Sequence, residues 1–407
     1  MEIKQNTLYL TTQNSYVSRD HLTLRIEVER ELKLAVPIHH LESVCIFGQS
    51  VISPAALELC WEHGVPVNYF SENGYFVGRW EGVANTSVML RRAQYRAADN
   101  PKVAALIARQ FVAGKLQNSR QSLLRSARET ESPEEGVQLR GAAAEIARLL
   151  QRLRDYGFAD ADDLSEPPAL AGGSSGERDT AAHSVKLSEP PALAGRPNAL
   201  SEPSAAADGS SGDPDTAAQV NDVDRIRGYE GQGANLYFKV FSFHLRQQRL
   251  DFAFTRRTRR PALDAMNCLL SFLYALVRHD CIAALTATGL DPFVGYLHSD
   301  RPNRPGLALD LMEEFRPLLA DRLAITLVNR KQIEIKDFSP REGGAFELKK
   351  DSRKAVIAAY QTRKQEVITH PIIGQEFRVG QLMLAQARIL ARHLRGDIPD
   401  YLPCVLR

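Results

Sequence analysis

A histidine and two carboxylates stand close together in the segment YLHSDRPNRPGLALDLMEEFRP, residues 296–317. His298 lies 12 residues before Asp310 and 15 residues before Glu313, and the intervening loop is long enough to fold back. An imidazole combined with oxygen ligands suits Mn²⁺ or Mg²⁺, ions that act on phosphate groups. These residues are therefore candidates for a metal site that cuts or joins a phosphate backbone.

An ordinary surface helix also explains this segment. In a helix over 306–317, Asp310, Glu313 and Glu314 share an arc of about 100° opposite the apolar residues. Such an acidic face is usually solvated, and a lone loop histidine is usually a capping or surface residue. The local pattern leaves both interpretations open.

A third carboxylate comes from the segment RIRGYEGQGANLYFKVF, in which Glu230 precedes Gly231, Gly233 and Ala234. The small residues permit close approach of another backbone or of a ligand next to the acid. The alternative is that they serve only helix packing and that Glu230 is a surface residue.

A cluster of arginines follows, interleaved with Phe252 and Phe254 and placed ahead of a strongly apolar helix. Arginines at this density can neutralise several phosphates with affinity that depends on salt and little on sequence. A solvated basic loop with surface ion pairs is the alternative. The candidate DNA-binding residues are Arg246, Arg249, Arg256, Arg257, Arg259 and Arg260.

The composition is that of a globular protein large enough for two or three domains, with 407 residues, 44% hydrophobic and 25% charged. Residues 157–220 hold eleven acids and three bases, so this segment carries −8 of a total net charge of +2. The remaining chain carries +10, which is compatible with a polyanionic partner.

Neither a disulfide framework nor a zinc knuckle is expected, because the five cysteines are scattered without CxxC spacing. Uninterrupted apolar runs such as AITLV are far shorter than the roughly 20 residues that cross a bilayer, and the start MEIKQNT is not a leader. We expect a cytoplasmic protein with reduced thiols and no membrane segment.

The pattern along the chain predicts an α+β protein. The first ninety residues contain alternating strand segments and one helix, SPAALELCWEHG, with a turn at SENG; helical periodicity follows from about residue 88, with a late hairpin around Gly343 and Gly344. Between the helices, LSEPPALAG occurs twice within a segment rich in Pro, Ala, Gly, Ser and acids. We expect residues 157–221 to be a flexible surface insertion rather than a docking segment.

Three blocks, YEGQGANLYF, RRTRRPALDAMNCLLSFLYALV and YLHSDRPNRPGLALDLMEEFRP, follow in this order after NTLYLTT, VPIHHLESVCIFG and GYFVGR. In this order the blocks resemble the CRISPR-associated integrase of bacterial and archaeal spacer acquisition. The resemblance covers nearly the whole chain apart from the insertion. The N-terminal segments and VMLRRAQYR look most like the branch found with one type I system.

The resemblance implies that Glu230, His298 and Glu313 hold the metal, with Asp310 assisting, and that Glu314 is a bystander on the flank of the helix. It implies an N-terminal β-rich dimerisation domain (1–92) and a mainly α catalytic domain (93–407). It further implies a homodimer that binds double-stranded DNA and assembles with the small second adaptation protein.

The implied reaction is attack of a 3′-hydroxyl on a phosphodiester at the edge of a repeat, assisted by Mg²⁺ or Mn²⁺. Two other functions stay open. One is a metal-dependent nuclease of branched or double-stranded DNA, and the other is a DNA-binding scaffold without catalysis.

Overall fold

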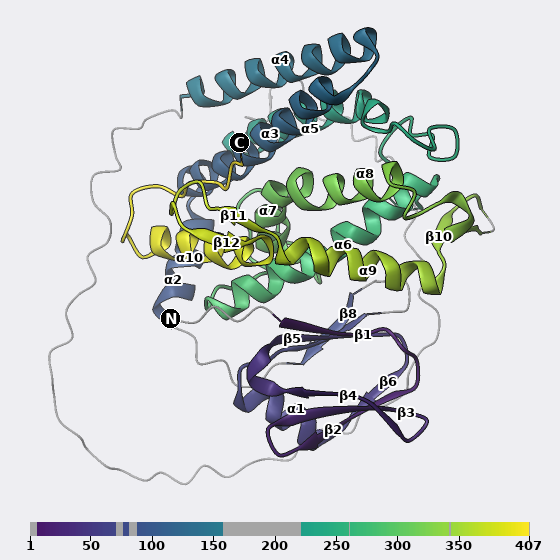
Figure 1. The fold of residues 1–407 in the computed structure, drawn as a ribbon. Coiled ribbons are helices and arrows are strands. Elements are labelled where there is room, and N and C mark those ends of the chain that lie inside the picture. Colours follow the sequence, from purple (N-terminus) through teal and green to yellow (C-terminus); the bar gives the residue numbers. More distant parts are fainter. Residues whose placement is uncertain are drawn as a thin grey trace, which may run out of the picture. The chain divides into compact units, whose positions relative to one another are not determined.

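The computed structural model describes residues 6–70, 76–80, 88–157 and 221–406, except 260 and 342. The fold begins with strands and continues with helices, so the predicted α+β class is confirmed (Figure 1). The SENG turn and most of the insertion at 157–221 lie outside the described residues.

Two four-stranded sheets form the N-terminal part. In the first sheet the order is β1-β5-β7-β8, with β1, β5 and β7 parallel and β8 antiparallel to β7. Its strands are β1 (Asn6–Leu10), β5 (Leu41–Phe47), β7 (Val67–Phe70) and β8 (Phe76–Trp80). In the second sheet the order is β4-β3-β2-β6. Its strands are β2 (Ser15–Asp20), β3 (Thr23–Val28), β4 (Glu31–Pro37) and β6 (Ser50–Ile52).

The predicted helix in this part is α1 (Pro54–Glu62), which starts as its sequence indicates. The Ser53 hydroxyl accepts a hydrogen bond from the Ala56 backbone N–H at 3.2 Å, and Pro54 occupies the first helical turn. The two strands that the sequence did not indicate are β2 and β6. β2 (SYVSRD) is rich in polar residues, β6 (SVI) is only three residues long, and the two pair with each other in parallel.

The remaining described chain is mainly helical. The first two long helices begin at capping residues. The Asn100 and Ser132 side chains accept hydrogen bonds from backbone N–H groups in the first turns of α3 and α4. The helices are α2 (Val88–Asp99), α3 (Pro101–Glu129), α4 (Pro133–Asp155), α5 (Asp222–Lys239), α6 (Ala265–Ala287), α7 (Gly306–Phe315), α8 (Arg322–Asn329), α9 (Lys350–Gln365) and α10 (Leu382–Leu394). Helices α3, α4 and α5 run side by side (Figure 1).

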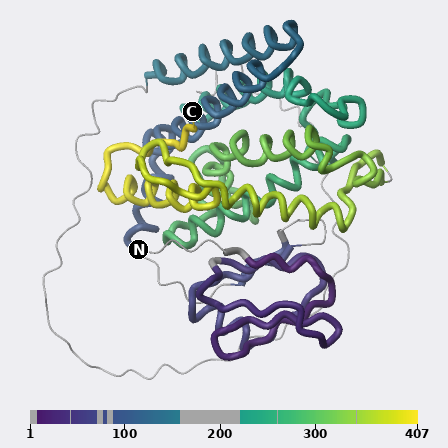
Figure 2. Tube along the Cα trace, in the orientation of Figure 1, coloured from purple at the N-terminus to yellow at the C-terminus, as the bar shows by residue number. Residues whose placement is uncertain are grey.

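The remaining described strands form two short hairpins. The predicted hairpin around Gly343 and Gly344 is confirmed, because β9 (Phe338–Pro340) pairs antiparallel with β10 (Phe346–Leu348) and both glycines have positive φ. The second hairpin joins β11 (Val367–Thr369) and β12 (Glu376–Arg378). After α10 the C-terminal segment returns to α3 (Figure 2). There the Asn118 amide donates a hydrogen bond to the Cys404 carbonyl at 2.8 Å.

Helix α6 is the central helix of the helical core. It is long and apolar enough by composition to cross a membrane, but most of it is buried among other helices, as in the core helix of many proteins. Its apolar residues do not form one uninterrupted run, because Arg278, His279 and Asp280 divide them. All five cysteines are free and four of them are buried, as expected.

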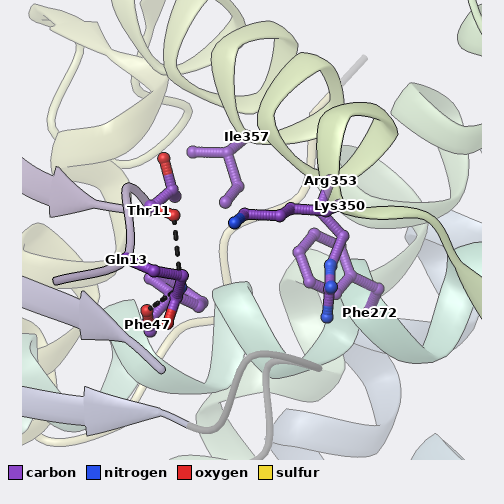
Figure 3. A pocket seen from close by; sticks show the side chains of 7 residues that line it. All are labelled: Thr11, Gln13, Phe47, Phe272, Lys350, Arg353 and Ile357. Carbon is purple, nitrogen blue, oxygen red and sulfur yellow. Dashed lines mark hydrogen bonds between the residues drawn. The ribbon is translucent and has the colours of Figure 1, made fainter. Parts of the chain in front are cut away.

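The first sheet packs against the helical core through buried aromatic and polar side chains. The His279 Nε2 atom lies 2.9 Å from the Cys45 sulfur and 3.3 Å from the Ser43 hydroxyl, and its ring meets the edge of Phe70. A small pocket nearby is lined by residues of the β1–β2 turn and of α9. Figure 3 shows the Lys350 side chain directed toward Thr11. The β strands and the helices thus share one buried contact region.

Burial of His279 predicts a pH-dependent stability. Burial and the charges of Arg79, Lys364 and Arg278 lower its pKa to about 3, against the opposing effect of Asp280. Because the pKa of His279 is lower in the folded protein, the unfolded chain binds the proton first as the pH falls. The contribution of neutral His279 to the unfolding free energy is therefore complete above pH 6.5 and is lost as the pH falls toward 3.

We therefore expect His279→Gln to remove part of the acid sensitivity. Between about pH 7.5 and about pH 5.5, its unfolding free energy should fall by about 1.4 kcal/mol less than that of the unmodified protein. Urea denaturation at both pH values measures this difference. An identical pH dependence in the two proteins would contradict the assignment.

Candidate metal centre

Three separate elements bring Glu230, His298 and Glu313 to one place. Glu230 lies on α5, His298 on the loop after α6, and Glu313 on α7. The His298 Nε2 atom is 3.9 Å from Glu313 Oε1. The Lys115 ammonium of α3 forms ion pairs with both Glu230 and Glu313, the latter at 2.7 Å. The predicted metal ligands therefore surround a common region.

The acids on α7 do not form a solvated face, so the surface-helix interpretation is wrong. Asp310 and Glu314 are fully buried and Glu313 is 2% exposed. The arc opposite the helix's apolar residues packs against α3, the His298 loop and the C-terminal segment rather than against water. These carboxylates must be satisfied by protein groups or by a cation.

Asp310 anchors the loop that carries His298. Its carboxylate accepts hydrogen bonds from the backbone N–H groups of Tyr296, Leu297 and His298 at 2.6, 2.9 and 3.0 Å. The His298 Nδ1 atom lies 2.6 Å from Asp310 Oδ1, and because a carboxylate only accepts, Nδ1 carries the proton. With Nδ1 as the donor, Nε2, which lies on the side of Glu313, is the ring nitrogen that can coordinate a metal.

Two glycines let this loop fold back onto the start of α7. A Cβ at Gly295 would lie 2.9 Å from the Asp310 carboxylate, and a Cβ at Gly306 would lie 2.8 Å from the Phe293 carbonyl oxygen. Any side chain at either position would push the loop away. Gly295 and Gly306 thus determine the distance between His298 and α7.

Glu230 is positioned by close packing of α5 on α3. A Cβ at Gly233 would collide with the Leu116 side chain, whereas a Cβ at Gly231 would meet open space. The small residue Gly233 therefore serves helix packing, and this packing also positions Glu230, one turn earlier, against Lys115.

Arg316 was not among the predicted site residues, although it contacts Glu313 at 3.2 Å. It lies in a π-helical turn, Arg316–Asp321, that follows α7 at Pro317, a residue without the N–H that a regular helix requires. Burial alone would raise the pKa of Glu313, but Arg316, Lys115 and His298 outweigh it and lower the pKa to about 2. Glu313 is therefore ionised.

Lys115 was also missed. Its position follows Phe111 and Val112 by four and three residues, so it falls on the buried stripe of α3, and it is 6% exposed. A lysine on an apolar helical face is a signal that a sequence search for buried charges could have detected.

Glu314 is not a bystander on the helix flank, and that expectation is corrected. Its side chain points into the protein, where it accepts hydrogen bonds from the Tyr401 hydroxyl, the Gln386 amide and the Cys404 backbone N–H. Burial raises its pKa to about 8, although these hydrogen bonds oppose the shift. Glu314 fastens the C-terminal segment to α7.

The structure does not gather the predicted arginines into one cluster at this site, although Arg259 is close enough to Arg304 to influence its pKa. Arg246 pairs with Glu129, and Arg249 forms two hydrogen bonds to Glu135 at 2.6 and 2.8 Å. Arg257 donates to Asn267 and Ser271 and stacks on Tyr274. Arg256 and Arg259 are exposed, and Arg260 lies outside the described residues.

The donor set fits a divalent cation, although not with the side chains as they stand. Two carboxylates and an imidazole nitrogen are ligands that Mg²⁺ or Mn²⁺ accepts. Glu313 Oε2 is buried and makes no hydrogen bond of normal geometry, although Lys115 lies within ion-pair distance. Within the described ranges, no three His, Cys, Asp or Glu side chains yet meet around one coordination point. The ammonium of Lys115 lies between two of the donors.

Removing the Asp310 carboxylate should destabilise the protein. Asp310→Ala leaves three buried backbone N–H groups without their acceptor, and we expect the unfolding free energy to fall by about 3 kcal/mol or more. The exposed Asp300 of the same loop provides the control, since Asp300→Ala should change it by less than about 0.5 kcal/mol. Urea denaturation compares the variants, and equal stabilities would refute this role of Asp310.

Comparison with known proteins agrees with this architecture. The family model described as CRISPR associated protein Cas1 matches residues 8–166 and 195–362. The chain is 39% identical to a protein of Moorella thermoacetica named CRISPR-associated endonuclease Cas1 1, over 100% of both chains. It is 38% identical to a protein of the same name from Chlorobaculum tepidum, over 99% of this chain and 98% of that one.

Solved structures share the fold. A Cas1 protein from Thermotoga maritima superposes with a TM-score of 0.69 at 20% identity, covering 99% of this chain and 100% of that chain. A casposase bound to its integration product superposes with a TM-score of 0.70 at 20% identity, covering 100% and 95%. The full-length match to named relatives and the family model show that this chain belongs to the Cas1 family of CRISPR-associated endonucleases.

Proposed function

We propose that this chain is a metal-dependent DNA integrase and endonuclease that inserts short DNA fragments into a CRISPR array. The observation that carries the proposal is the convergence of Glu230, His298 and Glu313 from three separate elements on one partly buried region. The names of the curated relatives support a reaction at a phosphodiester.

Glu230, Glu313 and the Nε2 atom of His298 would hold Mg²⁺ or Mn²⁺. When bound, such an ion polarises the phosphate, stabilises the developing negative charge and lowers the pKa of a bound hydroxyl. Asp310 retains the Nδ1 proton of His298 and keeps Nε2 directed toward the ion. Arg316 would orient the Glu313 carboxylate through their contact at 3.2 Å.

The reaction exchanges one phosphodiester for another. The 3′-hydroxyl of the incoming fragment attacks phosphorus and loses its proton, the bond to the 3′-oxygen of the repeat strand breaks, and that oxygen takes up a proton. With water in place of the hydroxyl, the same residues hydrolyse DNA, which is the nuclease alternative. Both reactions use one site, and they differ only in the nucleophile.

A group of arginines around the His298 loop supports DNA binding at this site. Burial lowers the pKa of Arg304, and the positive charges of Arg301, Arg227 and Arg259 lower it further, while Asp310 opposes them. Four guanidinium groups that repel one another beside a metal site form a binding region for phosphates. We propose Arg259, Arg301 and Arg304 as the principal DNA contacts, in place of the ion-paired Arg246 and Arg249.

We further propose a homodimer that assembles with the small second adaptation protein on double-stranded DNA in the cytoplasm, without membrane contact. Exposed apolar side chains on the second sheet support the dimer, since Tyr16, Leu32 and Val51 are 45%, 50% and 60% exposed. One structure of the same fold is named a Cas6-RT-Cas1–Cas2 complex, with a TM-score of 0.70 at 19% identity, covering 99% of this chain and 36% of that one.

A joining assay tests the proposed reaction. With Mn²⁺, a fragment with free 3′-hydroxyls and a plasmid that carries a repeat, the unmodified protein should form covalently joined products. Glu230→Gln, His298→Ala and Glu313→Gln should each lower joining by at least about a hundredfold, because each removes a ligand of the charge-stabilising ion.

Glu145→Gln on the exposed side of α4 is the matched control and should join as well as the unmodified protein. Cleavage without joined products would favour the nuclease alternative. Full joining by Glu230→Gln and His298→Ala would exclude the proposed site, whereas DNA binding without joining or cleavage by the unmodified protein would favour a scaffold.

A second assay separates the two sets of arginines. Arg301→Ala and Arg304→Ala should each weaken DNA binding about three- to tenfold at low salt and reduce the slope of log Kd against log salt by about 1. Arg249→Ala should change neither, because its guanidinium is held by Glu135. Fluorescence anisotropy with labelled duplex measures both quantities, and a larger effect of Arg249→Ala would contradict the assignment.

A further inference from the structure

Lys115 occupies the space between the two carboxylates of the proposed metal site. Its ammonium forms ion pairs with Glu230 Oε1 and with Glu313 Oε2, the latter at 2.7 Å. The Lys115 side chain is 8% exposed, and that of Glu313 is 2% exposed. The ammonium is therefore held where carboxylate oxygens from two different helices converge.

The contact is an ion pair rather than a complete hydrogen-bonded cage. Glu313 Oε2 is buried and has no hydrogen-bond partner of normal geometry, and its other oxygen is engaged by Arg316 at 3.2 Å. A buried carboxylate oxygen of this kind has capacity for a further cationic ligand. The ammonium balances negative charge at the site but does not occupy every hydrogen-bond acceptor position of the two carboxylates.

The charges of the two proposed carboxylate ligands are already balanced. Glu230 and Glu313 contribute two negative charges, and Lys115 and Arg316 contribute two positive charges. A divalent ion placed a few ångströms from a buried ammonium would be repelled strongly, because solvent screens such a pair poorly. The ion and the ammonium therefore compete for the same carboxylate oxygens.

The Lys115 side chain can leave without movement of its helix. Its backbone is fixed, because Leu116 packs directly on Gly233 of α5 and Gly114 packs on Glu314 and Pro403. The lysine side chain is unbranched and has four rotatable carbon–carbon bonds, so its ammonium can turn away without movement of α3. The helices thus keep the carboxylates in place while the cation between them is exchanged.

We propose that Lys115 is a built-in stand-in for the divalent cation, which holds Glu230 and Glu313 together in the metal-free protein and must withdraw when the metal binds. This inference rests on the proposed metal site. It predicts that the lysine lowers the affinity for the metal while stabilising the metal-free fold. Lys115 would set the metal concentration at which the enzyme becomes active.

A second buried lysine provides a matched control. Lys364 is 6% exposed, pairs with Asp280 at 2.8 Å and lies over the Tyr360 ring, among residues that the proposed metal site does not include. Its replacement also leaves a buried carboxylate without its partner, and so reproduces the loss of stability alone.

The experiment titrates Mn²⁺ into the full chain by calorimetry and records the melting temperature with and without Mn²⁺. Lys115→Met and Lys115→Gln should bind Mn²⁺ at least about tenfold more tightly, because the competing charge is gone. Both should melt at a lower temperature without metal and show a larger increase with Mn²⁺ than the unmodified protein. Lys364→Met should melt at a lower temperature but bind Mn²⁺ with unchanged affinity.

Unchanged or weaker Mn²⁺ binding by both Lys115 variants would overturn the proposal. Glu230→Gln separates this failure from failure of the metal site itself. If Glu230→Gln weakens Mn²⁺ binding while the Lys115 variants do not strengthen it, only the competition is wrong. If Glu230→Gln binds Mn²⁺ like the unmodified protein, the metal site and the inference are both wrong.

Discussion

Two carboxylates in a largely buried site repel one another unless a cation or a shared proton lies between them. In this protein Glu230 and Glu313 meet across the Lys115 ammonium, and the packing of α5 on α3 through Gly233 maintains that arrangement. The cost of burying these charges is offset by opposite charges supplied from α3 and from the π-helical turn after α7. The catalytic proposal depends on this electrostatic constraint, because a site that demands a cation is also a site that can accept a metal ion.

Asp310 performs a comparable task for the histidine. One carboxylate collects three backbone N–H groups and the Nδ1 atom of His298, so a loop without regular structure holds its imidazole in one orientation. Gly295 and Gly306 allow that loop to lie against the start of α7. The site therefore combines rigid helices for the carboxylates with a loop that is fastened at one residue.

The sequence predicted the fold class, most strands of the N-terminal part, the helix α1 and, through the resemblance to a family, the residues that converge. It did not reveal that Asp310 and Glu314 are buried, since an acidic arc on a helix has the same pattern whether it faces water or another helix. It also did not separate ion-paired Arg249 from the arginines near His298, because partners such as Glu135 are distant in sequence. Lys115 was not predicted, because the candidate ligands were carboxylates and a histidine and did not include the cation that pairs with them.

The most direct test of the account is the position of Mn²⁺ in a crystal of the full chain grown with the metal, located by its anomalous scattering. The account predicts a single strong peak at about 2.2 Å from oxygens of Glu230 and Glu313 and from His298 Nε2, with the Lys115 ammonium turned away. A peak bound by other residues, or a Lys115 ammonium still between the two carboxylates at saturating Mn²⁺, would contradict it.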